Sequence, residues 1–187
     1  MKKLIFFFIL IAFGNNSYSQ SENSITFDST TYIGTAIVNV PDASKDELYK
    51  RVKLWIAAAY RSGKTVTDLD DKSGEVYTIV LKAKKDVHVI HRKGFSEYEE
   101  ENDYSVLLKI KDGKLKIEIK DWNNNGYFWE GALHYPGGLI SNPNPPNAGH
   151  TKKTWKQVRE EVADFSKDLL SSFSNEMMNP VKSKDDF

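Results

Sequence analysis

The chain has 187 residues, and its 26 lysines and arginines balance its 26 aspartates and glutamates. A neutral chain lacks the basic surplus typical of nucleic-acid-binding proteins and of proteins that lie on membranes, so we expect neither partner. It contains no cysteine, which excludes disulfides, thiol catalysis, cysteine-ligated zinc and iron–sulfur clusters.

The first residues have the pattern of a secretory signal peptide. Two lysines precede an apolar run (residues 4–13), and Ser17 and Ser19 stand three and one positions before Gln20. The run is too short to span a bilayer, and Gln20 stands where a lipoprotein would carry cysteine. We expect residues 1–19 to be cleaved and the protein to be periplasmic or extracellular, with no stable membrane anchor. A retained anchor or a buried N-terminal helix is the alternative.

Residues 20–30 are polar and aperiodic, which predicts a flexible leader. A dense β-branched segment from Tyr32 to Val40 predicts a strand. Ser44 with Glu47 three positions later fits a capping box at a helix start. The helix after it carries one apolar stripe: Leu48, Val52, Trp55, Ile56 and Ala59.

The middle of the chain alternates short strands with polar turns. Thr65–Thr67 and Val76–Ala83 predict strands on either side of a turn at Asp70–Gly74. Val87–His91 either extends the second strand or forms a separate one. The acidic stretch Glu97–Asp103 predicts a solvated connection.

The sequence Asp112-Gly113 between two alternating runs is a strong hairpin signal, because it suits the positive φ angles of a type I′ turn. It predicts paired strands at Tyr104–Lys111 and Lys114–Asp121. In the second strand apolar and charged residues alternate, so one face of the sheet is buried and the other is wet.

The end of the domain combines a long irregular loop with a long helix. Residues 123–153 are rich in asparagine, glycine and proline, and a loop of this length is usually functional or disordered. A second capping box, Thr154 with Gln157, predicts the start of the helix, and residues 179–187 form a polar tail. The apolar stripe of this helix is Trp155, Val158, Val162, Phe165, Leu169 and Phe173.

Consecutive hairpins with two amphipathic helices predict one α+β domain at residues 31–178, with both helices on one face of an antiparallel sheet. The segments that carry a family resemblance are Glu47–Arg51 with Trp55, Asp70–Gly74, and Tyr104 with Val106–Lys114. In these the chain resembles an exported bacterial family of unknown function with a TBP-like fold. The resemblance covers residues 32–122 and implies no catalytic residues. The fold name does not imply DNA binding, because a fold does not fix a function.

The loop carries the one candidate binding site, a group of aromatic rings beside asparagine amides: Trp122, Tyr127, Phe128, Trp129 and Tyr135. Rings and amides together can form a platform for the apolar faces of sugars or for a partner's side chains. The alternative is that these rings anchor the long loop onto the sheet.

Other constellations have simpler interpretations. His88 and His91 point to opposite faces of a strand, so they are not expected to share a metal ion. His134 and His150 lie in the loop without a ligand frame and predict surface histidines. The acidic run at 97–103 is typical of a solvated surface rather than of a glycosidase carboxylate pair.

We therefore expect no metal and no cofactor. The favoured function is a non-catalytic, exported module that binds a small ligand or an envelope protein. The alternatives are an envelope hydrolase acting on glycans and a structural component of the envelope.

Overall fold

The structure, a computed structural model, describes residues 23–60, 65–91, 96–129, 133–135, 137–146 and 150–179. The elements run in the order β1 (Ser24–Asp28), β2 (Ile33–Asn39), α1 (Lys45–Ala59), β3 (Thr65–Asp71), β4 (Tyr77–His91), β5 (Ser96–Lys111), β6 (Lys114–Asn124), β7 (Tyr127–Trp129), β8 (Leu133–Tyr135) and α2 (Lys152–Met178).

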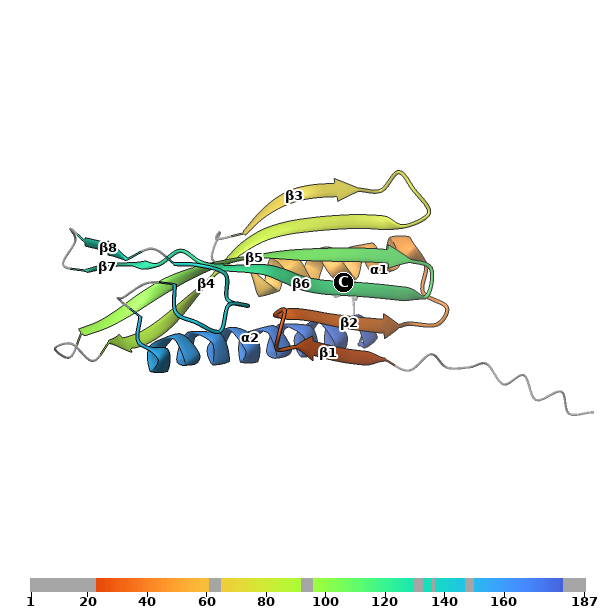
Figure 1. The fold of residues 1–187 in the computed structure, drawn as a ribbon. Coiled ribbons are helices and arrows are strands. Elements are labelled where there is room, and N and C mark those ends of the chain that lie inside the picture. The colour runs from red at the N-terminus through yellow and green to blue at the C-terminus, as the bar shows by residue number, and fades with distance from the viewer. Residues whose placement is uncertain are drawn as a thin grey trace, which may run out of the picture.

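Six strands form one antiparallel sheet in the order β1-β2-β6-β5-β4-β3, and β7 and β8 form a separate small hairpin. Both helices lie on the same face of the sheet, with α2 crossing behind β2 and β4 (Figure 1). No described element crosses the opposite face, which we call the outer face. The predicted α+β architecture is confirmed.

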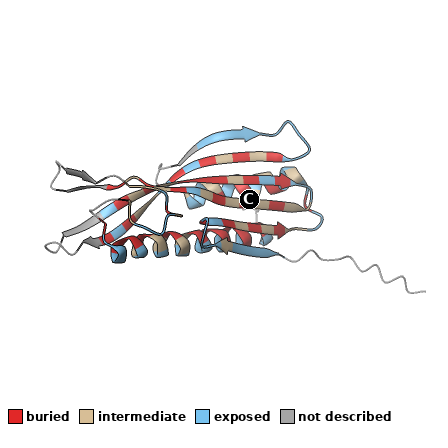
Figure 2. Cartoon of the chain, in the orientation of Figure 1, coloured by how far each residue is buried: buried red, intermediate tan, exposed pale blue. Residues whose placement is uncertain are grey.

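The core lies between the sheet and the helices. Along β4 the odd-numbered residues from Tyr77 to Val89 turn inward, whereas along β5 the even-numbered ones do, which gives the striped burial in Figure 2. The predicted helix stripes are confirmed at Val52 and at Val162. Ile56 and Phe165 are only partly buried but pack against the same core.

The predicted N-cap of the first capping box is confirmed, since the Ser44 side chain accepts a hydrogen bond from the Glu47 amide at 3.3 Å, whereas the Glu47 carboxylate pairs with Arg51. The second was predicted at the wrong residue. The N-cap of α2 is Thr151, whose Oγ1 accepts from the Thr154 amide at 3.1 Å. Thr154 is buried in the first turn of the helix.

Three segments were wrongly predicted to lack regular structure, and one of them is the loop at 123–153, which contains the paired strands β7 and β8. The leader at 20–30 contains β1, which pairs with β2 along its whole length, and Phe27 packs edge-on against Tyr32. The acidic stretch at 97–103 belongs to β5 and pairs with β4. In each case the partner strand satisfies the backbone hydrogen bonds, and composition alone does not show such a partner.

Candidate functional site

A β-bulge shapes the region between β5 and β6. The register passes from Ser105 opposite Lys120 to Asp103 opposite Asn123, so two residues of β6 face one of β5. The extra residue is Asp121, whose φ of +58° lies in the left-handed region that aspartate tolerates better than most residues. The bulge reverses the alternation of β6 and turns Trp122 toward the core.

Trp122, the first of the five predicted platform residues, is 3% exposed. Its ring stacks on Tyr104 with centroids 4.3 Å apart and meets the edge of Phe165. Burial raises the pKa of Tyr104 to about 12. The indole N–H of Trp122 has no hydrogen-bond partner within the described residues. This ring therefore belongs to the core and offers no surface to a ligand.

The other four predicted residues come together in the β7–β8 hairpin. Tyr127 is opposite Tyr135 in the register, with Phe128 and Trp129 following on β7. Their side chains lie outside the described residues, so the aromatic platform stays a prediction for this hairpin. Asn125 ties the base of the hairpin to β5, donating from its backbone amide to the Glu101 carbonyl at 2.9 Å.

A buried polar cluster lies at the same end of the sheet, formed by Glu100, Asn102, Asn124 and His150. Nε2 of His150 lies 3.0 Å from both carboxylate oxygens of Glu100, and Nδ2 of Asn124 donates to Glu100 and to Asn102 at 3.0 Å each. The four side chains therefore form one hydrogen-bonded network inside the protein.

This cluster overturns two predictions. Glu100 was assigned to a solvated acidic surface and His150 to the surface of the loop, yet both side chains are enclosed. Both can be buried because they satisfy each other's hydrogen bonds, with Asn124 as a further donor to Glu100, as buried polar groups require. The pair also fixes the chain immediately before α2, because Thr151 caps that helix.

The polar cluster is one of several contacts that hold residues 137–146 in place. Gly137 passes so close to β6 that a Cβ atom there would lie 1.8 Å from the Asn124 carbonyl oxygen. The Gly138 carbonyl accepts from the Asn124 amide at 2.9 Å. The indole of Trp155 donates to the Asn142 carbonyl at 2.8 Å. Backbone contacts and polar groups thus anchor the described part of the loop.

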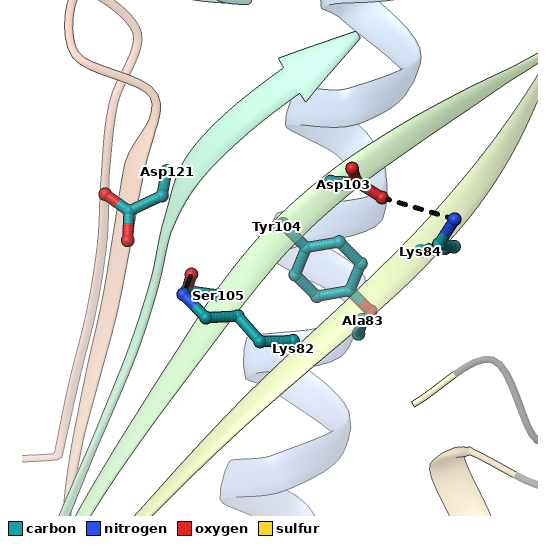
Figure 3. Close-up of a pocket in the computed structure, with 7 residues that line it drawn as sticks. All are labelled: Lys82, Ala83, Lys84, Asp103, Tyr104, Ser105 and Asp121. Carbon is teal, nitrogen blue, oxygen red and sulfur yellow. Dashed lines mark hydrogen bonds and ion pairs between the residues drawn. The ribbon is translucent and has the colours of Figure 1, made fainter. Parts of the chain in front are cut away.

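On the outer face, beside the bulge, lies a pocket of about 390 Å³. Its lining is Lys82, Ala83, Lys84, Asp103, Tyr104, Ser105 and Asp121 (Figure 3). Nζ of Lys82 donates to the Ser105 hydroxyl at 2.8 Å, and Nζ of Lys84 lies 3.8 Å from Asp103. The pocket therefore combines hydrogen-bond donors and acceptors of both charges.

The charges around the pocket are already partly compensated. Lys84 also binds Glu101 at 2.5 Å, and this hydrogen bond holds the pKa of Glu101 below its usual value. The described residues contain no group of three side chains suited to hold a metal ion. None of the helices in the described ranges is long and apolar enough to cross a membrane.

The solved structures to which the chain is similar include two that share its fold. A DUF4468 family protein from Bacteroides ovatus ATCC 8483 is 12% identical with a TM-score of 0.57, over 83% of this chain and 91% of that one. A TBP-like protein from Parabacteroides distasonis ATCC 8503 is 15% identical with a TM-score of 0.60, over 83% and 98%. At these identities the likeness shows the fold alone.

No curated protein matches the chain. One family model does, over residues 35–124, a range that runs from β2 to the last residue of β6. The matched range therefore includes the β5–β6 hairpin, the bulge and the outer-face pocket. The β7–β8 hairpin and α2 lie after its end. Residues 35–124 thus match the family described as a domain of unknown function (DUF4468) with TBP-like fold.

Proposed function

We propose that this protein is exported and acts as a non-catalytic binding domain, holding a polar ligand of the cell envelope against the outer face of its sheet. The observation that carries the proposal is the pocket beside the bulge, on the face opposite both helices. It is built on three adjacent strands rather than on loops, so its lining is held in place without a ligand. The signal-peptide pattern of residues 1–19 supports export.

The chemistry of the pocket favours binding over hydrolysis. A glycosidase needs two carboxyl groups in different environments, one of them with a raised pKa so that it can donate a proton. Here Asp103 lies beside Lys84 and is 46% exposed, and the pKa of the neighbouring Glu101 is lowered. Carboxylates in such surroundings accept hydrogen bonds from a ligand instead of protonating it.

The aromatic hairpin extends this proposed site. Nδ2 of Asn125 donates to Oε1 of Glu101 at 3.1 Å, and the same carboxylate holds Lys84 of the pocket. The base of the hairpin is thereby linked to the pocket lining. In this proposal an apolar face of the ligand, such as one side of a sugar ring, packs against the aromatic residues of the hairpin. These residues are Tyr127, Phe128, Trp129 and Tyr135.

Soluble peptidoglycan fragments are a suitable probe for the test. The chain from Gln20 onward is titrated with them while backbone amide NMR signals are followed, and the fragments are then analysed by chromatography. We expect shifts at Lys82 and Ser105, and fragments of unchanged length. A Ser105→Arg variant, which fills the pocket, should lose the shifts, whereas Lys156→Ala on α2 should keep them.

Two results would overturn the proposal. Shortened fragments would identify a hydrolase, and the absence of shifts around the pocket at millimolar fragment would remove the binding role. The unfolding midpoint of Ser105→Arg, measured alongside, establishes that the lost shifts come from the filled pocket and not from an unfolded domain.

A further inference from the structure

Four lysines lie together on the outer face, at the closed end of the β5–β6 hairpin: Lys109, Lys111, Lys114 and Lys116. We call them the lysine ladder. Their inward neighbours Ile110 and Leu115 are buried, so alternation places the lysines on the outer face. The register sets Lys109 directly opposite Lys116 and Lys111 directly opposite Lys114. The ladder thus has two rungs, each of two positive charges.

This arrangement works against the stability of the sheet, because like charges directly opposite each other on adjacent strands repel. Little in the fold compensates. Lys116 pairs with Glu118 at 2.9 Å, but within the described ranges Lys109, Lys111 and Lys114 have no ion-pair partner. The nearby Asp112 is turned to the start of α1, where it accepts from the Lys45 amide at 2.7 Å.

The positive charge continues from the ladder toward the pocket. Lys120 and Lys82 lie on the same face, in one row with Ser105. Glu118 is the acidic residue between this row and the ladder, and it pairs with both Lys116 and Lys120, so two lysines share one carboxylate. The chain as a whole is neutral, so this surface concentrates charge that is balanced elsewhere. A local positive surface raises the concentration of anionic ligands beside it.

The spacing of the rungs favours a chain of anions over a single one. Neighbouring strands lie about 4.8 Å apart, and residues two apart along a strand are about 6.7 Å apart. A small anion can therefore contact one rung, whereas an extended chain with regularly repeated charges contacts both rungs and then Lys120. Several weak contacts on one chain act together and increase the affinity.

The surroundings of the ladder distinguish between classes of polyanion. The described outer-face residues of β5 and β6 include no aromatic ring on which the bases of a single-stranded nucleic acid could stack. The exposed large apolar side chains of the described residues all lie outside β5 and β6. The described part of the outer face of these two strands therefore has no apolar side chain suited to insert into a lipid bilayer.

We propose that the lysine ladder binds an acidic polysaccharide, an extended chain that carries about one carboxylate per sugar. The polymer lies along the hairpin on the outer face and reaches the pocket through Lys120 and Lys82. This inference rests on the proposed function, because it names the ligand class of the same exported binding face.

The test uses the chain from Gln20 onward and oligogalacturonates of two to twelve sugars, with binding measured by calorimetry at several salt concentrations. We expect affinity to rise with chain length and to fall as salt is added. The variant Lys109→Gln/Lys111→Gln should weaken binding of the twelve-sugar chain by at least about tenfold. The control Lys50→Gln/Lys156→Gln makes the same charge change on the helices and should leave binding unchanged.

A second measurement keeps the test independent of folding. The variant Lys109→Glu sets opposite charges across one rung, so its unfolding midpoint in urea should be equal to or above that of the parent while polysaccharide binding falls. A lower midpoint would mean that the lysines serve the fold, and would overturn the inference.

Other outcomes overturn the inference while leaving the proposed function intact. These are equal binding by the ladder and control variants, no dependence on chain length, and tighter binding of a twelve-nucleotide DNA or of phosphatidylglycerol vesicles. Peptidoglycan fragments would still shift the pocket residues in each case. Conversely, a protein that binds oligogalacturonate through the ladder but is retained in the cytoplasm would contradict the proposed function alone.

Discussion

Glu100 and His150 show how much of this end of the domain depends on one buried pair. The carboxylate accepts from His150 and from Asn124, and no part of either side chain of the pair is exposed. Removing one partner of a buried pair leaves the other charge desolvated, which costs more than the pair itself contributed. A variant that replaces His150 is therefore destabilised mainly because Glu100 stays buried without its partner.

We predict that His150→Ala lowers the free energy of unfolding by about 3–5 kcal/mol, because it leaves the Glu100 carboxylate buried with fewer donors. Urea unfolding followed by tryptophan fluorescence measures the change. Lys156→Ala, on the exposed side of α2, serves as the control and should stay within about 0.5 kcal/mol of the parent. A His150→Ala variant equal to the control would show that the pair does not stabilise the fold.

Asp121 is the residue that permits the bulge, and its positive φ makes its substitutions informative. Valine at this position should lower the free energy of unfolding by about 1–2 kcal/mol, because a β-branched side chain clashes in the left-handed region. Glycine adopts this conformation freely and should be as stable as aspartate or slightly more so. Thermal unfolding of the three proteins gives the order, and valine as stable as glycine would contradict the bulge geometry.

Among the secondary-structure elements, the β7–β8 hairpin carries the aromatic residues assigned to the ligand. We predict that Trp129→Ala reduces the binding of peptidoglycan fragments and leaves the unfolding midpoint nearly unchanged. The reason is that the described part of the following loop is already held by Gly137, Gly138 and the Glu100–His150 pair. Binding and stability are measured on the same sample. A loss of binding that tracks a loss of stability would show that the ring is an anchor.

Local signals predicted the elements that depend on local chemistry. Asp112-Gly113 set the hairpin, and Ser44 with Glu47 set the start of α1. The start of α2 was misplaced because Thr151 and Thr154 both fit a cap by local pattern. Thr151 holds that position in the structure, where the preceding His150 is tied to Glu100 on β5. A capping motif spans only a few residues, so it cannot indicate a contact between residues 50 positions apart.

Long-range pairing also explains the missed strands. The inward series of β5 continues from Tyr104 back through Asn102 to Glu100, so alternation was present, but the acidic composition of the segment concealed it. β1 is a short edge strand whose partner, β2, lies beyond a turn that no standard dipeptide marks. The bulge was hidden for a related reason, because aspartate occupies a position where glycine would have signalled a positive φ.

At the scale of the whole molecule, fold class and family follow from the sequence more readily than the binding surface does. The alternation in β6 already indicated one wet face, and the structure confirms it. The ladder and the pocket, however, depend on which residues of neighbouring strands stand opposite each other. A shift of one residue in that register would move all of these side chains to the other face.

Export concerns the whole protein, and it is tested directly by cell fractionation. We predict that the protein is recovered outside the cytoplasm and that N-terminal sequencing reads from Gln20, because Ser17 and Ser19 suit a signal peptidase. Replacing Ser19 with a bulky residue, as in Ser19→Trp, should retain the uncleaved precursor. Recovery of a cytoplasmic protein that still begins at Met1 would contradict the prediction.

The bulge at Asp121 also sets how this chain can change in length. Trp122 and Asn124 face inward because the bulge takes up one extra residue, so a regular strand of the same length would turn both side chains to solvent. The donor to Glu100 would leave with Asn124, and the chain segment held by Gly137 and His150 would lose its attachment. Deleting Asp121 alone would instead remove the need for the bulge and leave Trp122 and Asn124 facing inward in a regular strand, so the chain should tolerate the loss of one residue at this position.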